Sequence, residues 1–230
     1  MLASSTAFVA GSINVAGVIA FLAFTSNITG HVANLAKNVV GLDFKSVELF
    51  FVWLLLFFGG AFVSSFIINS FKHKSNYQAH AIPIVLEICI LIFVAVYGNH
   101  FYQESETERE VVIGCILFAM GLQNSMVSII SGGLIKSTHL TGLITDLGAE
   151  VAEWIHPKAA KTTVVKNKIF VRTTILSFYV FGGLVAAYLF NFFEFKIFYF
   201  VPLILLTILY YDLMPVILHK IVRPFTLNKS

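Results

Sequence analysis

The sequence predicts an all-α membrane protein, with six transmembrane helices plus two short re-entrant half-helices, built as two inverted repeats. Composition is the first reason, because 58% of the 230 residues are hydrophobic and only 12% are charged. Uncharged runs reach the roughly 20 residues that a helix needs to cross a bilayer. The second reason is an internal repeat, and the third is the placement of the charged residues.

The repeat centres on a polar Thr-Gly segment. Residues 25–39 recur in changed form as residues 137–151. A Gly-x-x-Asn sequence precedes each copy and Phe-Gly-Gly follows each copy. The identical pairs at one constant offset are Thr29/Thr141, Gly30/Gly142, Leu35/Leu147 and Val39/Val151. We therefore interpret the chain, 1–230, as one transmembrane domain made of two versions of one unit, at about 1–100 and about 111–220.

The predicted transmembrane helices follow the uncharged or nearly uncharged runs. Two of the runs contain one acid each, Glu87 and Asp212. The first run lacks the basic n-region of a signal peptide, so we interpret it as a mature transmembrane helix. The six predicted helices cover residues 7–26, 48–71, 80–99, 111–135, 169–192 and 197–218.

The two Thr-Gly segments, residues 27–40 and 139–155, are interpreted as half-helices. As a helix, residues 27–40 would rise only about 21 Å, against a hydrocarbon core of about 30 Å. The run 111–135 is long enough to cross completely, so the chain has to fold back before the second half-helix. Gly132 and Gly133 permit such a turn, whereas the first repeat has no matching glycines.

Charge placement favours six crossings over eight. With six crossings and a cytoplasmic N-terminus, the basic segments 72–74 and 158–172 and the basic C-terminal tail are cytoplasmic, and the acidic loop 104–110 is outside. This arrangement obeys the positive-inside rule, whereas eight crossings would reverse the first basic segment and the acidic loop. Both termini are therefore predicted to be cytoplasmic. Three crossings per repeat also invert the second repeat about a pseudo-twofold axis in the membrane plane.

The motifs resemble the YoaK-type family of bacterial integral membrane proteins, described as a domain of unknown function. The resemblance covers nearly the whole chain in the expected order. It rests on Ala10-Gly11-x-x-Asn14, the first Thr-Gly segment, Gly121-Leu-Gln-Asn124, the segment from Ser137 to Gly148, and Arg172 ahead of Phe181-x-Gly183. His31 departs from the family, in which Asn commonly follows the first Thr-Gly. The resemblance implies a multi-pass protein of the bacterial cytoplasmic (inner) membrane and supplies no reaction or substrate.

A half-helix that begins at mid-membrane leaves its first N–H groups without partners and presents the positive end of its dipole. Such an end is tolerated only against protein or a water-filled cavity. If both starts converge, they form a polar site that favours an anion or the acceptor end of a neutral solute. The alternative is that Thr-Gly only lets two helices pack closely. The flanking polar residues are good caps, and the glycines are expected to let another backbone or a ligand approach. The candidate binding residues are Asn14, Ser26, Asn27, Thr29, Gly30, His31, Asn34, Gln123, Asn124, Thr138, His139, Thr141, Gly142 and Asp146.

Two acids are candidates for proton coupling. Glu87 interrupts an apolar helix, where a charge costs about 2.5 kcal/mol or more, so it marks function by default. The alternative is a structural glutamate, neutral or paired with Arg172. Asp146 occupies the position equivalent to Asn34 in the first repeat. It is interpreted either as a cation or proton site or as an acid that complements the helix dipole.

The first functional hypothesis is a small transporter or channel for a small polar or anionic solute, with its site between the two Thr-Gly half-helices. The second is a membrane-embedded enzyme acting on lipid or quinone, with His31, His139 and Asp146 as acid–base groups. The third is a non-catalytic accessory subunit, which expects a dry core around Thr29 and Thr141.

The sequence predicts no catalytic residues, no metal site and no cofactor. It contains no His-Glu-x-x-His, no paired cysteines, no phosphate-binding Gly-rich loop and no Gly-x-Ser-x-Gly. The excess of Lys and Arg over acids reflects membrane orientation, so no nucleic-acid partner is expected. The expected partners are the lipid bilayer and the solute, and a homo-oligomer stays open.

Overall fold

The computed structural model describes residues 2–73, 76–103, 105–133, 138–157 and 162–226. Ser137 of the second motif and the side chain of Asp212 lie outside the described part. Within it the chain forms eight α-helices and one short 3-10 helix, and no strand. The elements are α1 (Leu2–Phe21), α2 (Ile28–Val40), α3 (Phe44–Phe71), α4 (Asn76–His100), α5 (Glu106–Ile130), α6 (Leu140–Ile155), α7 (Thr163–Phe193), η1 (Glu194–Lys196) and α8 (Ile197–Thr226).

The prediction of an all-helical membrane protein is confirmed. Five stretches are long and apolar enough to cross a membrane, and the fifth, Thr163–Tyr211, contains α7 and the first half of α8. The chain is therefore a multi-pass membrane protein. The two Thr-Gly segments form the short helices α2 and α6, which are not among these stretches.

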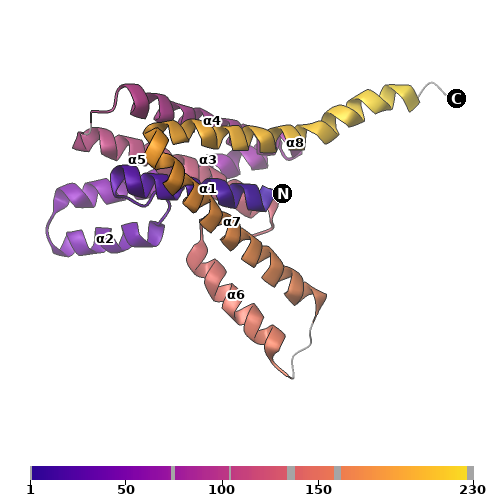
Figure 1. Ribbon diagram of the computed structural model, residues 1–230, viewed down its shortest axis with the longest axis horizontal. Helices are drawn as coiled ribbons and strands as arrows, with labels where there is room; N and C mark the ends of the chain where they lie inside the picture. The colour runs from indigo at the N-terminus through magenta and orange to yellow at the C-terminus, as the bar shows by residue number, and fades with distance from the viewer. Residues whose placement is uncertain (1, 74–75, 104, 134–137, 158–161, 227–230) are drawn as a thin grey trace.

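The short helices lie beside the long helices that follow them. Figure 1 shows α2 alongside α3 at the left of the molecule and α6 alongside α7 at the lower right. Asn27 begins α2 by accepting a hydrogen bond from the Gly30 amide (3.0 Å). Asp43 and Thr162 cap α3 and α7 in the same way, through the amides three residues on. Local sequence thus sets where each helix starts.

Two helix pairs form the centre of the fold, α1 with α7 and α3 with α5. In both pairs a glycine on each helix lies against backbone of the other. A Cβ added at Gly11 or Gly182 would overlap the carbonyl of Tyr179 or Phe8, and a Cβ at Gly60 or Gly121 would overlap the carbonyl of Phe118 or Phe57. The carbonyl always belongs to the residue three before the partner's glycine, so the two crossings have the same geometry. Contact of this kind is how small residues let membrane helices approach.

This geometry also corrects the alignment of the Phe-Gly-Gly sequences. Gly60, the second glycine of the first copy, corresponds to Gly182, the first glycine of the second copy. The crossings pair the first helix of each repeat with a helix of the other repeat. The repeats are therefore interleaved rather than packed as two separate halves.

Candidate functional site

After α1 and after α5 the chain folds back along the helix that it has just left. Leu22 makes the first turn with φ 55°, and Gly132 and Gly133 make the second with φ 62° and 84°. The predicted glycine turn is confirmed, and the first repeat uses leucine in the left-handed region instead of a glycine. Helix α1 consequently ends at Phe21, five residues short of the predicted end.

Two asparagines hold the returning segments. Asn14 accepts hydrogen bonds from the Thr25 amide (3.0 Å) and the Ser26 hydroxyl (3.1 Å). Asn124 accepts one from the Thr138 amide (3.1 Å) and donates to the hydroxyl of the same residue. Asn14 lies seven residues before the end of α1, so the start of α2 is held about 10 Å inside that end. These amides therefore have a structural role in both repeats.

The Thr-Gly glycines accommodate the cap side chains of their own helices. An added Cβ at Gly30 would lie 2.7 Å from the Asn27 amide nitrogen, and one at Gly142 would overlap the His139 ring. Side chains of the same helix start therefore occupy the space beside these glycines, where a ligand or a second backbone was expected. His139 makes no side-chain hydrogen bond to the first turn of α6. The first turn of α6 therefore lacks a side-chain cap, unlike that of α2.

A cavity of about 410 Å³ lies where the two short helices begin. It brings together eight of the fourteen predicted binding residues, which come from both repeats: Asn14, Ser26, Asn27, Thr29, Asn124, Thr138, His139 and Thr141. Its other walls are Phe24, Ile28, Leu140 and the equivalent residues Phe57 and Tyr179. No carboxylate, lysine or arginine lines it, within the part of the chain that the structure describes. The lining offers hydroxyls, amides and one imidazole.

Tyr179 is a lining residue that the sequence analysis missed. Its hydroxyl accepts a hydrogen bond from the Asn14 side-chain amide (2.8 Å), so it ties α7 to the fold-back of the first repeat. The signal that could have identified it is its position three residues before Gly182, which corresponds to Phe57 before Gly60.

Three further predicted residues, Gly30, His31 and Asn34, line a neighbouring cavity of about 370 Å³ together with Asn27. The two cavities share Phe24 and Asn27, so they adjoin. The far side of the second cavity carries Glu106, Arg109 and Glu110.

His31 fixes α2 against α3. The imidazole Nε2 lies 2.9 Å from the Phe24 carbonyl oxygen, and the ring packs against Phe50 and Trp53 with centroids 5.8 and 5.3 Å away. Burial lowers the pKa of His31, which lies outside the candidate spans.

Asp146 is not at the central cavity. Its carboxylate pairs with Arg172 (2.8 Å), which also binds the buried Glu150 through Nε at 3.0 and 3.1 Å. These three side chains join α6 to α7. The alternative that paired Arg172 with Glu87 is wrong, because α6 brings its own two acids to the arginine.

Glu87 and Gln123 are both fully buried and line neither cavity. Neither carboxylate oxygen of Glu87 has a hydrogen-bond partner in the described part of the chain. Its helix α4 packs against α5 and α8, and Ile84, Ile88 and Leu91 lie on the same buried face. The predicted intramembrane acid is thus enclosed by an apolar core.

The fold and the cavity define a multi-pass helical membrane protein with a polar cavity between its two short helices. Residues 2–211 match the family described as "Protein of unknown function (DUF1275)", and the chain belongs to that family. The resemblance to the YoaK-type proteins is consistent with this membership. No curated protein and no solved structure matches the chain.

Proposed function

We propose that this protein is a transporter or channel of the bacterial cytoplasmic membrane for a small polar or anionic solute. The solute binds in the cavity between the starts of α2 and α6. The single observation that carries the proposal is that this one cavity is lined by equivalent polar residues of both repeats. A binding site at the interface of two inverted repeats, made by broken helices, is typical of secondary transporters.

The lining determines the class of solute. Residues at two helix N-termini line the cavity, and one of these termini lacks a side-chain cap. Such termini favour negative charge or hydrogen-bond acceptors. A cation site would call for carboxylates, and the cavity lining contains none. We therefore infer an inorganic anion, a carboxylate metabolite or a neutral polyol-like solute.

The proposed topology has six crossings and two re-entrant half-helices, with both termini in the cytoplasm. The equivalent glycine crossings and the equivalent asparagine fold-backs support two inverted repeats. The positive-inside rule gives the orientation, with Lys72 inside and Glu106 outside. In that orientation the cavity at His31 is the outer vestibule of the solute site.

Glu87 is the proposed proton-coupling group. A buried carboxyl without a partner is stable only when it is neutral, and a neutral carboxyl can release its proton when the local environment changes. Asp146 serves this role less well, because it is half-exposed and held by Arg172.

Solute flux in proteoliposomes tests the proposal. A panel of small anions and neutral metabolites is expected to include a transported species. Replacing both Thr29 and Thr141 by valine keeps the side-chain shape and removes two hydroxyls, so the half-saturating concentration should rise roughly tenfold or more. Thr207→Val is the matched control, because that hydroxyl bonds its own helix at Leu203. Absence of any flux, together with absence of ligand stabilisation, rules the proposal out.

The two other hypotheses have less support. The acid–base groups of a membrane enzyme do not gather, since His139 lines the central cavity, His31 lines the vestibule, and Asp146 pairs with Arg172. An accessory subunit would have no cavity at Thr29 and Thr141, whereas both residues line one.

A further inference from the structure

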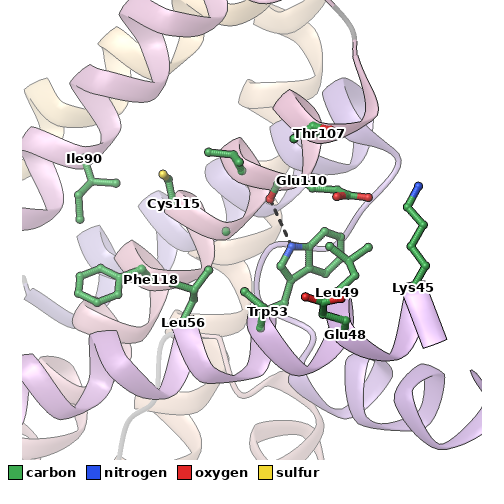
Figure 2. Close-up of a pocket in the computed structure, with 13 residues that line it drawn as sticks. Lys45, Glu48, Leu49, Trp53, Leu56, Ile90, Thr107, Glu110, Cys115 and Phe118 are labelled. Carbon is green, nitrogen blue, oxygen red and sulfur yellow. Dashed lines mark hydrogen bonds between the residues drawn. The ribbon is translucent and has the colours of Figure 1, made fainter. Parts of the chain in front are cut away.

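A groove of about 730 Å³, separate from the central cavity, runs between α3 and α5. Figure 2 shows its lining residues, with one side chain, Ile90, contributed by α4. The groove is polar at one end and apolar elsewhere. Its polar residues, Lys45, Glu48, Thr107 and Glu110, all lie within the first five residues of α3 or α5.

The apolar part is long and narrow. From Glu48 to Leu56 along α3 the groove extends about 12 Å, and from Thr107 to Phe118 along α5 it extends about 16 Å. Gly114 keeps it open, because a Cβ at this position would lie 2.7 Å from Leu56 Cδ1. Such a shape accommodates an unbranched alkyl chain.

Trp53 forms a rigid wall of this groove. Its indole nitrogen donates a hydrogen bond to the Glu110 carbonyl oxygen (3.3 Å), and the side chain is 6% exposed. Phe50 packs edge-on against the same ring at 5.5 Å. The wall is thus fixed before any ligand arrives, which lowers the entropic cost of binding.

The mouth of the groove carries net negative charge. Lys45 is engaged by Glu106, with 2.6 Å between the ammonium nitrogen and the carboxylate. Glu48 and Glu110 have no ion-pair partner among the residues that the structure describes. Arg109 lines the two cavities on the other side of α5 and not this groove. The two unpaired carboxylates therefore favour a cationic group over an anionic group at the mouth of the groove.

We propose that this groove binds an amphiphile with an ammonium head and an unbranched alkyl chain. The head lies between Glu48 and Glu110, near the face of Trp53, where the ring adds cation–π attraction. The chain follows α3 and α5 toward Phe118. The ligand is an aminolipid of the membrane, because α3 and α5 are both long and apolar enough to cross it. A free long-chain amine shares this chemistry and is the alternative that the competition experiment separates. The proposal does not depend on solute transport.

Quenching of Trp53 fluorescence tests the site directly. The chain has two tryptophans, Trp53 and Trp154, so Trp154→Phe leaves only the reporter in the groove. The probes are an alkylammonium and an alkyl sulfate of equal length, each brominated in mid-chain. They are titrated into protein in alkyl maltoside micelles, which contain no ammonium group. We expect saturable quenching by the ammonium probe at about a tenfold lower concentration than by the sulfate probe.

Three variants, two of them with a matched control, test whether the probes are bound in the groove. Replacing Glu48 and Glu110 together by glutamine should abolish the preference for ammonium, whereas the exposed Glu153→Gln on α6 should preserve it. Gly114→Val should weaken quenching by both probes, and Gly148→Val, where nothing lies within 4 Å of the added Cβ, is its control. Trp53→Phe leaves Trp154 to report quenching by the bulk micelle.

The outcomes are distinct. Competition by added phosphatidylethanolamine, and not by phosphatidylglycerol, identifies the membrane aminolipid as the ligand, whereas no competition identifies the free amine. Equal quenching by the two probes, or a preference that survives in the double glutamine variant, overturns the proposal. The proposal is also overturned if the ammonium probe quenches Trp154 in the Trp53→Phe variant as strongly as it quenches Trp53 in the Trp154→Phe variant. If Gly114→Val does not fold, the glutamine variants still decide.

Discussion

Replacing Gly60 by alanine tests whether the α3–α5 crossing depends on direct backbone contact. The added Cβ would lie 3.0 Å from the Leu122 amide nitrogen and closer still to the Phe118 carbonyl oxygen, whereas ordinary contacts begin at 3.4 Å. Both atoms belong to helix backbone, so no side chain can rotate away. The helices must therefore separate, which also lengthens the hydrogen bond between Ser65 and Ser125, now 2.7 Å.

The adjacent Gly59→Ala variant is the matched control. Its Cβ would meet the Phe118 ring at 3.6 Å, which is an ordinary contact. Both variants gain the same helix preference of alanine, so that contribution cancels in the comparison. Overpacking costs about 1–3 kcal/mol and a weakened interhelical hydrogen bond about 0.6 kcal/mol, so Gly60→Ala should be about 2–3 kcal/mol less stable than Gly59→Ala.

Reversible unfolding in mixed micelles with dodecyl sulfate, followed by circular dichroism, measures the free energy of unfolding of each variant. Stabilities equal within about 0.5 kcal/mol would refute the backbone-contact interpretation of the crossing. Gly182→Ala in the α1–α7 crossing should behave like Gly60→Ala, because its Cβ meets the Phe8 carbonyl in the same way.

Three further predictions concern the polar residues. Burial lowers the pKa of His31, so as the pH falls the unfolded state binds a proton before the folded state does. The stability of the protein should therefore fall as the pH decreases from about 7 to 5. The melting temperature of His31→Phe should decrease less over the same pH range. Arg172→Gln should lower the free energy of unfolding by about 3–5 kcal/mol, because Glu150 stays buried without a partner, whereas the half-exposed Asp146→Asn should change it by less than about 1 kcal/mol. Glu87→Gln should keep or raise the melting temperature, because neither oxygen has a bond to lose; a large decrease would reveal a partner for the carboxyl.

The sequence predicted the helices well because apolar length and internal repetition are local signals. All six long helices and both short ones overlap the ranges that were predicted for them, although several ends differ by five residues or more. It did not predict the end of α1, because the turn at Leu22 uses a leucine with φ 55°, which nothing in the local composition indicates. The sequence also did not predict which helices pair at the glycine crossings. The glycines indicate that another helix approaches closely, but not which one.

The candidate site was predicted in part. The caps and hydroxyls of the Thr-Gly segments share one cavity because the fold-backs, fixed by Asn14 and Asn124, bring both helix starts together. Gln123 does not join them, because it is fully buried and lines neither cavity. Asp146 was predicted at the site but lies away from it for a different reason. Its carboxylate pairs with Arg172, and no local sequence pattern connects these two residues.

The interleaving of the two repeats has a consequence for biogenesis. Helix α1 buries its glycine face only against α7, which is synthesised last but one. At about 5–20 residues per second, α7 leaves the ribosome roughly 10 to 30 s after α1. During that interval Ser12 and Asn14 face the membrane without Gly182 and Tyr179, their hydrogen-bond partners in the finished fold. Neither half of the chain is therefore expected to assemble alone, and insertion should require a protein that shields α1 until synthesis is nearly complete.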